Sequence, residues 1–308
     1  MPFTISHALA VLPGLRQDRL GTPRGRGPLV AAALVAGSFA PDVPYFADSL
    51  ISGVYGYGTF THAPLGLVTA DPLIAAGLVG GWVLLREPVV ALLPERSRDR
   101  IAVLAGCGDR RPLTVRSAAA FWASAAAGAL THVVWDAFTH HDRWGVRLLP
   151  VLDHEVHGTP LHKYAQYGSS AVALVVLAAY GVRALRAVPA PGPRTTGAPD
   201  KAENRRSRPP GLPRLSRRAR GIALAAIGTT TLAAAALRAG QWYGATGDAF
   251  GIIPSGLFGA GAGLALAATA YAGAVRLTHR TGGGSAQCAA DSQSVPTPTE
   301  TSSGARRG

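Results

Sequence analysis

Apolar segments of membrane-spanning or nearly membrane-spanning length recur along this chain, and they limit its fold more than any other feature. A helix needs roughly 20 apolar residues to cross the hydrocarbon core of a bilayer. The composition agrees, since 48% of the residues are hydrophobic and only 15% are charged. We predict an all-α fold, a polytopic transmembrane helical bundle of about six spans, with a short apolar helix at residues 2–15 before it. The expected spans are 29–40, 64–85, 117–135, 169–188, 221–239 and 252–275.

The loops between these segments alternate between rich and poor in basic residues. Residues 16–26, 86–116 and 189–220 hold most of the arginines, whereas 41–63, 136–168 and 241–251 hold few. Basic loops stay on the cytoplasmic side of a membrane, so the second set is expected outside and the C-terminus in the cytoplasm. Topology therefore explains the formal net charge of +13 without a nucleic-acid partner, and the expected partner is membrane lipid. The oligomeric state is left open.

Composition divides the chain into four parts. Residues 1–188 are expected to form a membrane bundle, 189–220 a disordered basic linker, 221–275 a C-terminal transmembrane hairpin and 276–308 a disordered tail. In the last span Gly259 and Gly263 offer a small-residue face for close helix packing. Cys107 and Cys288 are isolated in the sequence, so neither a disulfide framework nor a thiolate metal site is expected.

The N-terminal segment allows two topologies. Residues 2–15 form either a helix on the membrane surface, with Met1 inside, or a hairpin with residues 28–40 that carries His7 to the outer side. The basic flank and the apolar run up to Ala40 also resemble a signal peptide. Pro41 directly after that run argues against cleavage and favours a retained helix.

The stretch Thr131-His132-Val133-Val134-Trp135-Asp136-Ala137-Phe138-Thr139-His140-His141 closes one apolar segment. On a helix His132, Asp136 and His140 have the spacing i, i+4, i+8 and share one face. A lone histidine at a membrane interface is more often a surface or packing residue than a ligand. Ionisable groups beside an apolar helix are costly to desolvate, however, and usually face a partner or a cavity. The spacing therefore indicates a functional His/Asp face.

Other ionisable residues stand where neighbouring spans begin or end. Asp42 closes one apolar segment, His62 opens the next, His132 and Asp136 close a third, and His162 with Gln166 opens a fourth. In an up-and-down bundle these ends lie together. His7 joins them only if the N-terminus forms the hairpin.

Imidazole and carboxylate ligands without thiolates suit zinc or another first-row divalent cation, which activates water for hydrolysis. The expected metal ligands are His7, Asp42, His62, His132 and Asp136. Asp136 or His140 would serve as the base, and His162 with Gln166 would complete the catalytic site. The expected cofactor is thus a divalent metal, with zinc favoured, and nearby cations are available for a phosphate: Arg143, Arg147 and Lys163.

Five motifs together resemble a bacterial membrane-protein family catalogued as domain of unknown function 4184. They are Ser6-His7-Ala8, Ala40-Pro41-Asp42, Phe60-Thr61-His62, Thr131-His132-x-x-Trp135-Asp136-x-Phe138-Thr139-His140 and Leu161-His162-x-x-x-Gln166-x-Gly168-Ser169-Ser170. The resemblance covers roughly residues 1–185 and implies a bacterial plasma-membrane protein, but it brings no activity with it.

The same order of His and Asp residues is more distantly similar to membrane-bound metal-dependent hydrolases of the YdjM type and to zinc-dependent phospholipases C. That similarity implies metal binding by His7, Asp42, His62, His132 and Asp136. Gln166 stands where the phospholipases have a glutamate, and their N-terminal tryptophan ligand is missing. The resemblance therefore implies a site of one or two metals rather than three.

These observations favour a metal-dependent hydrolase that acts on a phosphoester or lipid-linked substrate at the membrane surface. One alternative is a non-catalytic protein whose His/Asp set conducts protons or a transported ion. Such a protein would need ionisable residues deep in several spans, whereas most spans here have none. A second alternative is a scaffold whose basic linker binds anionic lipid or a partner.

Overall fold

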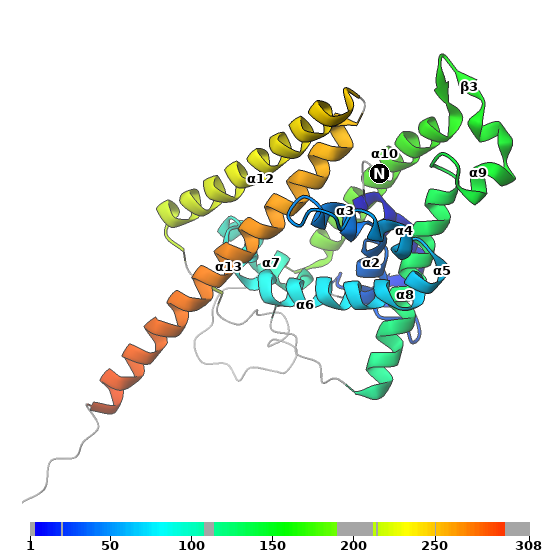
Figure 1. Cartoon of the computed structure of the whole chain (residues 1–308). Coiled ribbons are helices and arrows are strands. Elements are labelled where there is room, and N and C mark those ends of the chain that lie inside the picture. The colour runs from blue at the N-terminus through cyan, green and yellow to red at the C-terminus, as the bar shows by residue number, and fades with distance from the viewer. Residues whose placement is uncertain are drawn as a thin grey trace, which may run out of the picture.

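The fold is taken from a computed structural model, which describes residues 4–19, 21–107, 114–189, 212–213, 215–249 and 251–292. Within these ranges five helices are long and apolar enough to cross a membrane. The protein is therefore an all-α membrane protein, as predicted. The helices, shown in Figure 1, are α6 (Ala70–Ala91), α8 (Val115–Ala137), α10 (Leu161–Ala187), α12 (Arg217–Thr246) and the Ile252–Thr278 part of α13 (Ile252–Ser292).

The prediction that residues 29–40 form a membrane span is wrong. These residues fold instead into the seven-residue helix α2 (Ala31–Gly37), about 10 Å long at 1.5 Å per residue. This length is a third of the roughly 30 Å hydrocarbon core. The short helix lies inside the bundle against α6 and α8, where it contributes to a core of buried alanines: Ala33, Ala36, Ala75 and Ala125.

Two glycines allow α2 to approach α8 at backbone distance. A Cβ atom on Gly37 would lie 2.1 Å from the carbonyl oxygen of Ala125, and one on Gly128 would lie 2.2 Å from that of Leu34. Any side chain at either position would therefore clash with main-chain atoms. The first turn of α2 is also tied to α8, because the Val30 amide donates to the Ser124 hydroxyl at 2.9 Å. This close contact fixes the residues that follow α2 against the C-terminal half of α8.

The N-terminal segment is not a single regular helix. It consists of η1 (Thr4–His7), α1 (Ala8–Val11) and η2 (Leu12–Gly14), followed by a hairpin of β1 (Leu15–Gln17) and β2 (Pro23–Gly25). Both η1 and α1 pack against α10 and α8. The short apolar helix expected at residues 2–15 is thus present as three consecutive helical pieces over Thr4–Gly14, which pack within the bundle.

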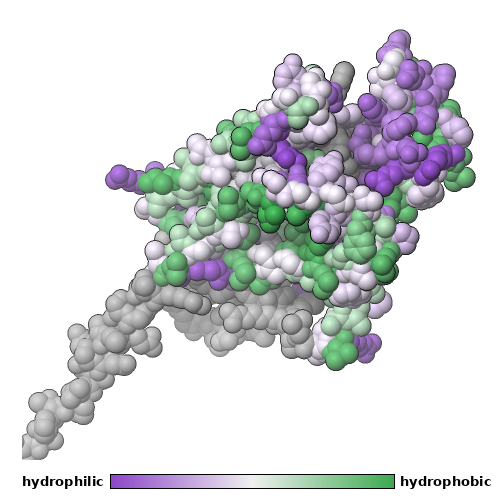
Figure 2. Space-filling view, viewed as in Figure 1, coloured by the Kyte–Doolittle hydropathy of each residue, from purple (hydrophilic) through white to green (hydrophobic). Residues whose placement is uncertain are grey.

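Short helices connect α2 to the first span. They are η3 (Ala40–Asp42), α3 (Val43–Ala47), α4 (Tyr57–Thr61) and α5 (Pro64–Val68). On the far side of α8 the chain continues through α9 (Trp144–Leu148), η4 (Pro150–Asp153) and a small antiparallel hairpin of β3 (Glu155–Val156) and β4 (Thr159–Pro160). Figure 2 shows hydrophilic residues gathered over the segment with α9 and β3, so this end of the molecule is its polar end.

The two C-terminal helices, α12 and α13, pack along each other as the predicted hairpin. The expected small-residue face is part of this contact, since a Cβ on Gly259 would lie 2.3 Å from the carbonyl oxygen of Ala234. The helix α13 continues to Ser292, so the first residues of the predicted tail are helical. Residues 293–308 and most of the predicted linker, 190–211, lie outside the described residues. The helix α7 (Glu95–Leu104) follows α6 in the basic loop.

A proline in α6 explains why a side chain of α13 forms hydrogen bonds with the main chain of α6. Pro88 lies inside α6 and has no N–H, so the carbonyl of Leu84 loses its usual donor four residues later. Arg276 of α13 supplies the missing donors, with Nη2 at 2.6 Å and Nε at 3.1 Å from that oxygen. A cation thus satisfies a carbonyl that would otherwise be unpaired within the helix.

This arrangement makes a testable prediction. Replacing Arg276 by methionine removes the bond to the Leu84 carbonyl and should destabilise the protein by about 1 kcal/mol. In a Pro88→Ala background the alanine amide bonds the same carbonyl, so the Arg276→Met change should cost less than half as much. Unfolding of the four proteins in detergent measures this double-mutant cycle. Equal costs in both backgrounds would contradict the compensation by Arg276.

Candidate metal centre

The predicted His/Asp face lies at the C-terminal end of α8. His132 and Asp136 are one turn apart, and both are buried, with 0% and 3% of their surfaces exposed. The helix ends at Ala137, so His140 is not on the same helix as the spacing predicted. The chain turns back instead, and His140 Nδ1 lies 3.5 Å from Asp136 Oδ1. Two of the three residues are thus placed by the helix and the third by the turn that ends it.

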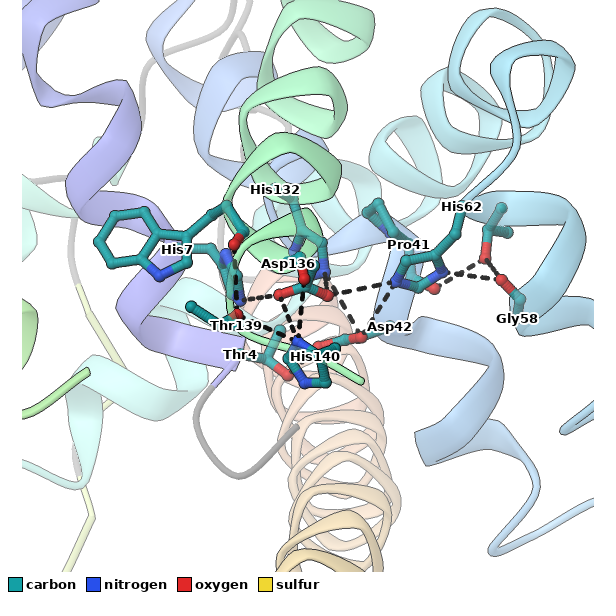
Figure 3. A network of polar contacts seen from close by, with 12 residues as sticks. Thr4, His7, Pro41, Asp42, Gly58, His62, His132, Asp136, Thr139 and His140 are labelled. Carbon is teal, nitrogen blue, oxygen red and sulfur yellow. Dashed lines mark hydrogen bonds and ion pairs between the residues drawn. The ribbon is translucent and has the colours of Figure 1, made fainter. Parts of the chain in front are cut away.

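Three other chain segments bring their own ligands to this helix end. Asp42 is the last residue of η3, His62 follows α4 directly, and His7 ends η1. All three are buried, and Figure 3 shows their side chains around Asp136. The structure therefore gathers the five predicted metal ligands, and His7 lies with them as the hairpin alternative required. His7 also stacks on the imidazole of His132, with ring centroids 3.8 Å apart.

The carboxylates of Asp136 and Asp42 face the imidazole nitrogens. Asp136 Oδ2 lies 3.4 Å from His132 Nε2 and 3.6 Å from His62 Nε2, while Oδ1 lies 3.5 Å from His7 Nε2. Asp42 Oδ1 lies 3.5 Å from His132 Nε2 and 3.8 Å from His62 Nε2. Two donors bonded to one ion at roughly 2.0–2.2 Å are no more than ~4.4 Å apart. All five distances satisfy this limit.

Main-chain carbonyls determine which nitrogen of each ring carries the proton. His132 Nδ1 lies 2.8 Å from the Ser38 carbonyl oxygen, and His62 Nδ1 lies 2.7 Å from that of Gly58. A carbonyl oxygen only accepts hydrogen bonds, so each Nδ1 is the donor. In the neutral rings the lone pairs are then on the two Nε2 atoms, which point at the carboxylates. This is the ring orientation of metal-ligating histidines, whose other nitrogen is held by an acceptor.

Lone pairs facing carboxylate oxygens repel unless a proton or a metal cation lies between them. Among the described residues, four buried atoms of the centre have no hydrogen-bond partner: His7 Nδ1, Asp42 Oδ1, Asp136 Oδ1 and His132 Nε2. Unpaired polar atoms inside a protein are costly, and charged ones more so. Two triads of residues can each offer ligand atoms within 4.8 Å of one another, His7–His132–Asp136 and Asp42–His62–His132. Because the triads share His132, they form one centre, and its residues fit a divalent cation.

The ligands outside the membrane-spanning helices have protonation states that suit metal binding. Burial, reinforced by the neighbouring His132, lowers the pKa of His7 to about 3. Burial alone would raise the pKa of Asp42, but His132 and a hydrogen bond from the Thr4 hydroxyl outweigh it and hold the pKa below its ordinary value. Burial also lowers the pKa of His140. At neutral pH His7 is therefore neutral and Asp42 charged, as metal ligation requires.

The structure places Gln166 and His162 in different groups of residues, although we expected them to act together. The Gln166 side-chain nitrogen lies 2.7 Å from His140 Nε2, so Gln166 supports the ring that contacts Asp136. His162, one turn earlier on α10, lies with Asp153 and His141 in a separate triad near the polar end of the molecule. Its Nδ1 is 3.2 Å from Asp153 Oδ1. The described contacts therefore join His140 to Asp136, and they place His162 in another group.

Sequence reasoning missed two residues beside the centre. Thr4 precedes His7 by three residues, a spacing that puts both on one side of a helical turn, and its hydroxyl bonds Asp42. Asp71, directly before Pro72, lies in the first turn of α6 with 0% of its surface exposed. Neither of its carboxylate oxygens has a hydrogen-bond partner among the described residues. A carboxylate directly before a proline gave no sign of this burial.

Comparison with known proteins gives one match. A family model described as "Domain of unknown function (DUF4184)" matches residues 1–272, which is most of the chain. No curated protein and no solved structure matches. The match extends beyond the five motifs into the C-terminal hairpin. The more distant similarity to YdjM-type hydrolases and zinc-dependent phospholipases C stays a prediction.

Proposed function

The chain belongs to the DUF4184 family, and because that family's function is unknown we propose one from the chemistry of the site: a membrane-bound, divalent-metal-dependent hydrolase of phosphoesters. The observation that carries this proposal is the buried convergence of imidazole nitrogens and carboxylate oxygens, four of which have no hydrogen-bond partner among the described residues. Zinc fits the nitrogen and oxygen donors best. The site lies at the polar end of a spanning helix, which suits a substrate at the membrane surface.

One of the five ligands, Asp136, would both hold the ion and take part in the reaction. His7, Asp42, His62, His132 and Asp136 would hold the ion, which when bound would neutralise charge on a phosphoryl oxygen and acidify water. Asp136 Oδ1 is free of hydrogen bonds from described residues and is the acceptor for the proton of the attacking water. His140 Nδ1 lies 3.5 Å from this oxygen. Water adds to phosphorus, the bond from phosphorus to the ester oxygen breaks, and the departing alcohol takes up a proton.

The proposed setting is a bacterial plasma membrane crossed several times. The basic α7 loop would lie in the cytoplasm together with the C-terminus, and the polar segment with α9 and β3 would lie outside. The metal centre would then open on the outer surface. This orientation rests on the distribution of basic residues between the loops.

Hydrolysis by the purified protein tests the proposal. We expect the detergent-purified chain to release para-nitrophenolate from bis(para-nitrophenyl) phosphate, to stop after chelation, and to recover with Zn²⁺. Asp136→Asn should abolish the reaction, whereas Asp99→Asn, an exposed carboxylate on α7, should keep the wild-type rate. A metal-loaded protein that hydrolyses neither this diester nor para-nitrophenyl phosphate would overturn the proposal. Metal-dependent ion flux in proteoliposomes, lost in His132→Ala, would then support a transport function.

A further inference from the structure

A cavity of about 230 Å³ adjoins the metal centre between α5 and α8. Two of the proposed ligands, His62 and Asp136, form its polar end. Its walls are apolar and come from both helices: Leu67, Leu130, Val133 and Val134. Arg143 and Trp144 complete the lining from the segment after α8. The cavity is therefore bordered by two proposed metal ligands, by apolar side chains and by the cation of Arg143.

The polarity of this cavity changes along α8. Its polar end, at Asp136 and Ala137, coincides with the end of the spanning helix. Leu130 lies seven residues earlier, which is about 10 Å along the helix axis at 1.5 Å per residue. The cavity thus extends from the membrane surface toward the hydrocarbon region. A ligand that fills it must be anionic or polar at one end and apolar at the other.

The apolar wall of the cavity is open toward the surroundings of the bundle. Leu130 is 51% exposed, Val134 40% and Trp144 49%. Leu65 and Val68 of α5, beside the lining residue Leu67, are also exposed. Leu130 and Val134 lie on α8, which is long and apolar enough to cross a membrane, so these two side chains would face lipid. An apolar chain can therefore enter sideways from the bilayer without crossing water.

The volume limits how much of a ligand the cavity holds. Pockets that enclose a whole drug-sized molecule measure roughly 300–1,000 Å³. A cavity of about 230 Å³ accommodates only part of such a molecule. One segment of a single chain fits this space, while the rest of the ligand remains in the lipid.

Arg143 supplies the positive charge for the other end of the ligand. The neighbouring Arg147 pairs with Asp142 at 3.8 Å, whereas Arg143 has no ion pair with any carboxylate that the structure describes. The positive charge of Arg143 partly offsets the rise that burial causes in the pKa of the Tyr45 hydroxyl. The Tyr45 ring packs against that of His62, with centroids 5.8 Å apart. A guanidinium offers paired N–H donors that match two phosphate oxygens. Arg143 is therefore placed to bind a phosphate that lies next to the metal centre.

We propose that the cavity is a chain-binding subsite for a lipid phosphate ester, which enters from the bilayer with its phosphate between Arg143 and the metal centre. This inference rests on the proposed function for the identity of the reacting group. It adds the substrate class, a membrane lipid with an apolar chain attached through phosphate, and the direction of entry. Val134 and Leu130 determine the fit of the chain, and Arg143 determines the preference for phosphate.

Photolabelling of the full-length protein in lipid nanodiscs tests the subsite without measuring turnover. The probe is a long-chain alkylphosphonate with a diazirine in its chain, because the carbon–phosphorus bond is not hydrolysed. We expect labelling of peptides from α5 and α8. Val134→Trp should fill the cavity and lower this labelling about tenfold, while Val175→Trp, an exposed position on α10, should leave it unchanged. Arg143→Gln should weaken labelling about tenfold through loss of charged hydrogen bonds.

Competitors separate the chain from the phosphate. An alkyl phosphate of the same length should compete with the probe, and inorganic phosphate should compete at least a hundredfold less well. Equal competition by inorganic phosphate, or equal labelling in Val134→Trp and Val175→Trp proteins of normal thermal stability, would overturn the subsite. Labelling with these preferences in a protein that hydrolyses no phosphoester would retain the subsite and reject the hydrolase. Hydrolysis of soluble diesters without site-specific labelling would retain the hydrolase and reject the subsite.

Discussion

Replacing Asp136 by alanine is expected to remove about one metal ion per chain from the purified protein. Asp136 faces three of the other proposed ligands, His7, His62 and His132, at 3.4–3.6 Å. Loss of this carboxylate removes a ligand and half of the negative charge of the centre. His132→Ala should have the same effect, because both metal-binding triads of the centre contain His132. Elemental analysis of the protein prepared with Zn²⁺ in excess gives the ion count.

The stability of the metal-free protein provides a second measurement of the same change. The wild type should lose several degrees of Tm on chelation, since a ligand stabilises only the state that binds it. The Asp136→Ala variant should lose none. His154→Ala, an exposed histidine in the polar segment after α8, is the matched control and should behave as wild type.

The separate triad of His141, Asp153 and His162 needs its own control, because it also offers ligand atoms. His162→Ala removes the buried member of that triad and leaves the centre at α8 intact. If Asp136→Ala and His132→Ala keep the metal content of the wild type while His162→Ala loses it, the ion belongs to this separate triad and our assignment is wrong. A wild type without stoichiometric metal in metal-replete medium would also contradict it.

Replacing Gly128 by alanine is expected to destabilise the fold and the metal centre together. The new Cβ would lie 2.2 Å from the Leu34 carbonyl oxygen and 2.9 Å from the Ser38 amide nitrogen, both main-chain atoms of the α2 segment. The helices must then separate, and we expect a loss of about 3 kcal/mol, the upper part of the range for overpacking. The 2.8 Å bond from His132 to the Ser38 carbonyl lies in the same contact. Metal affinity should therefore fall as well.

A glycine on another spanning helix provides the matched control. Gly181 lies in α10, and no atom is within 4 Å of the position its Cβ would take. Gly181→Ala should leave metal binding unchanged and stabilise the helix by roughly 0.5–1 kcal/mol. Denaturant unfolding in detergent and metal titration of both variants make the comparison. Equal behaviour of Gly128→Ala and Gly181→Ala would show that the close contact between α2 and α8 is not required.

Sequence patterns predicted the spanning helices that are long and uniformly apolar, and they failed for α2. The run at residues 29–40 has the composition of a membrane span, because burial in protein and burial in lipid select the same side chains. Its length was the available sign, since Pro28 and Pro41 enclose only 12 residues. Composition also gave no sign that α13 continues through the Gly- and Ser-rich residues up to Ser292.

The candidate site followed from the sequence where the ligands lie at helix ends. Asp42, His62, His132 and Asp136 were predicted together from the alternation of starts and ends, and the structure places them together. His7 depended on the path of the N-terminal segment, which contacts between η1 and α10 determine. His162 also starts a helix, but it points to a group of its own with Asp153. The order of helix starts and ends predicts at which end of the bundle a residue lies, but it does not predict the direction in which the side chain points.

The carbonyl bonds to His132 and His62 also determine which charge of ion the centre can keep. Many metal sites orient a histidine with a carboxylate, which adds a negative charge for each ring. Here Ser38 and Gly58 use neutral main-chain oxygens, so the ligands carry two negative charges in total. A divalent ion leaves this buried centre electrically neutral. A monovalent or trivalent ion leaves one net charge in a region of low dielectric constant, where uncompensated charge is costly. In the proposed metal centre, a preference for a divalent ion would thus follow from the backbone of the two segments that hold the rings.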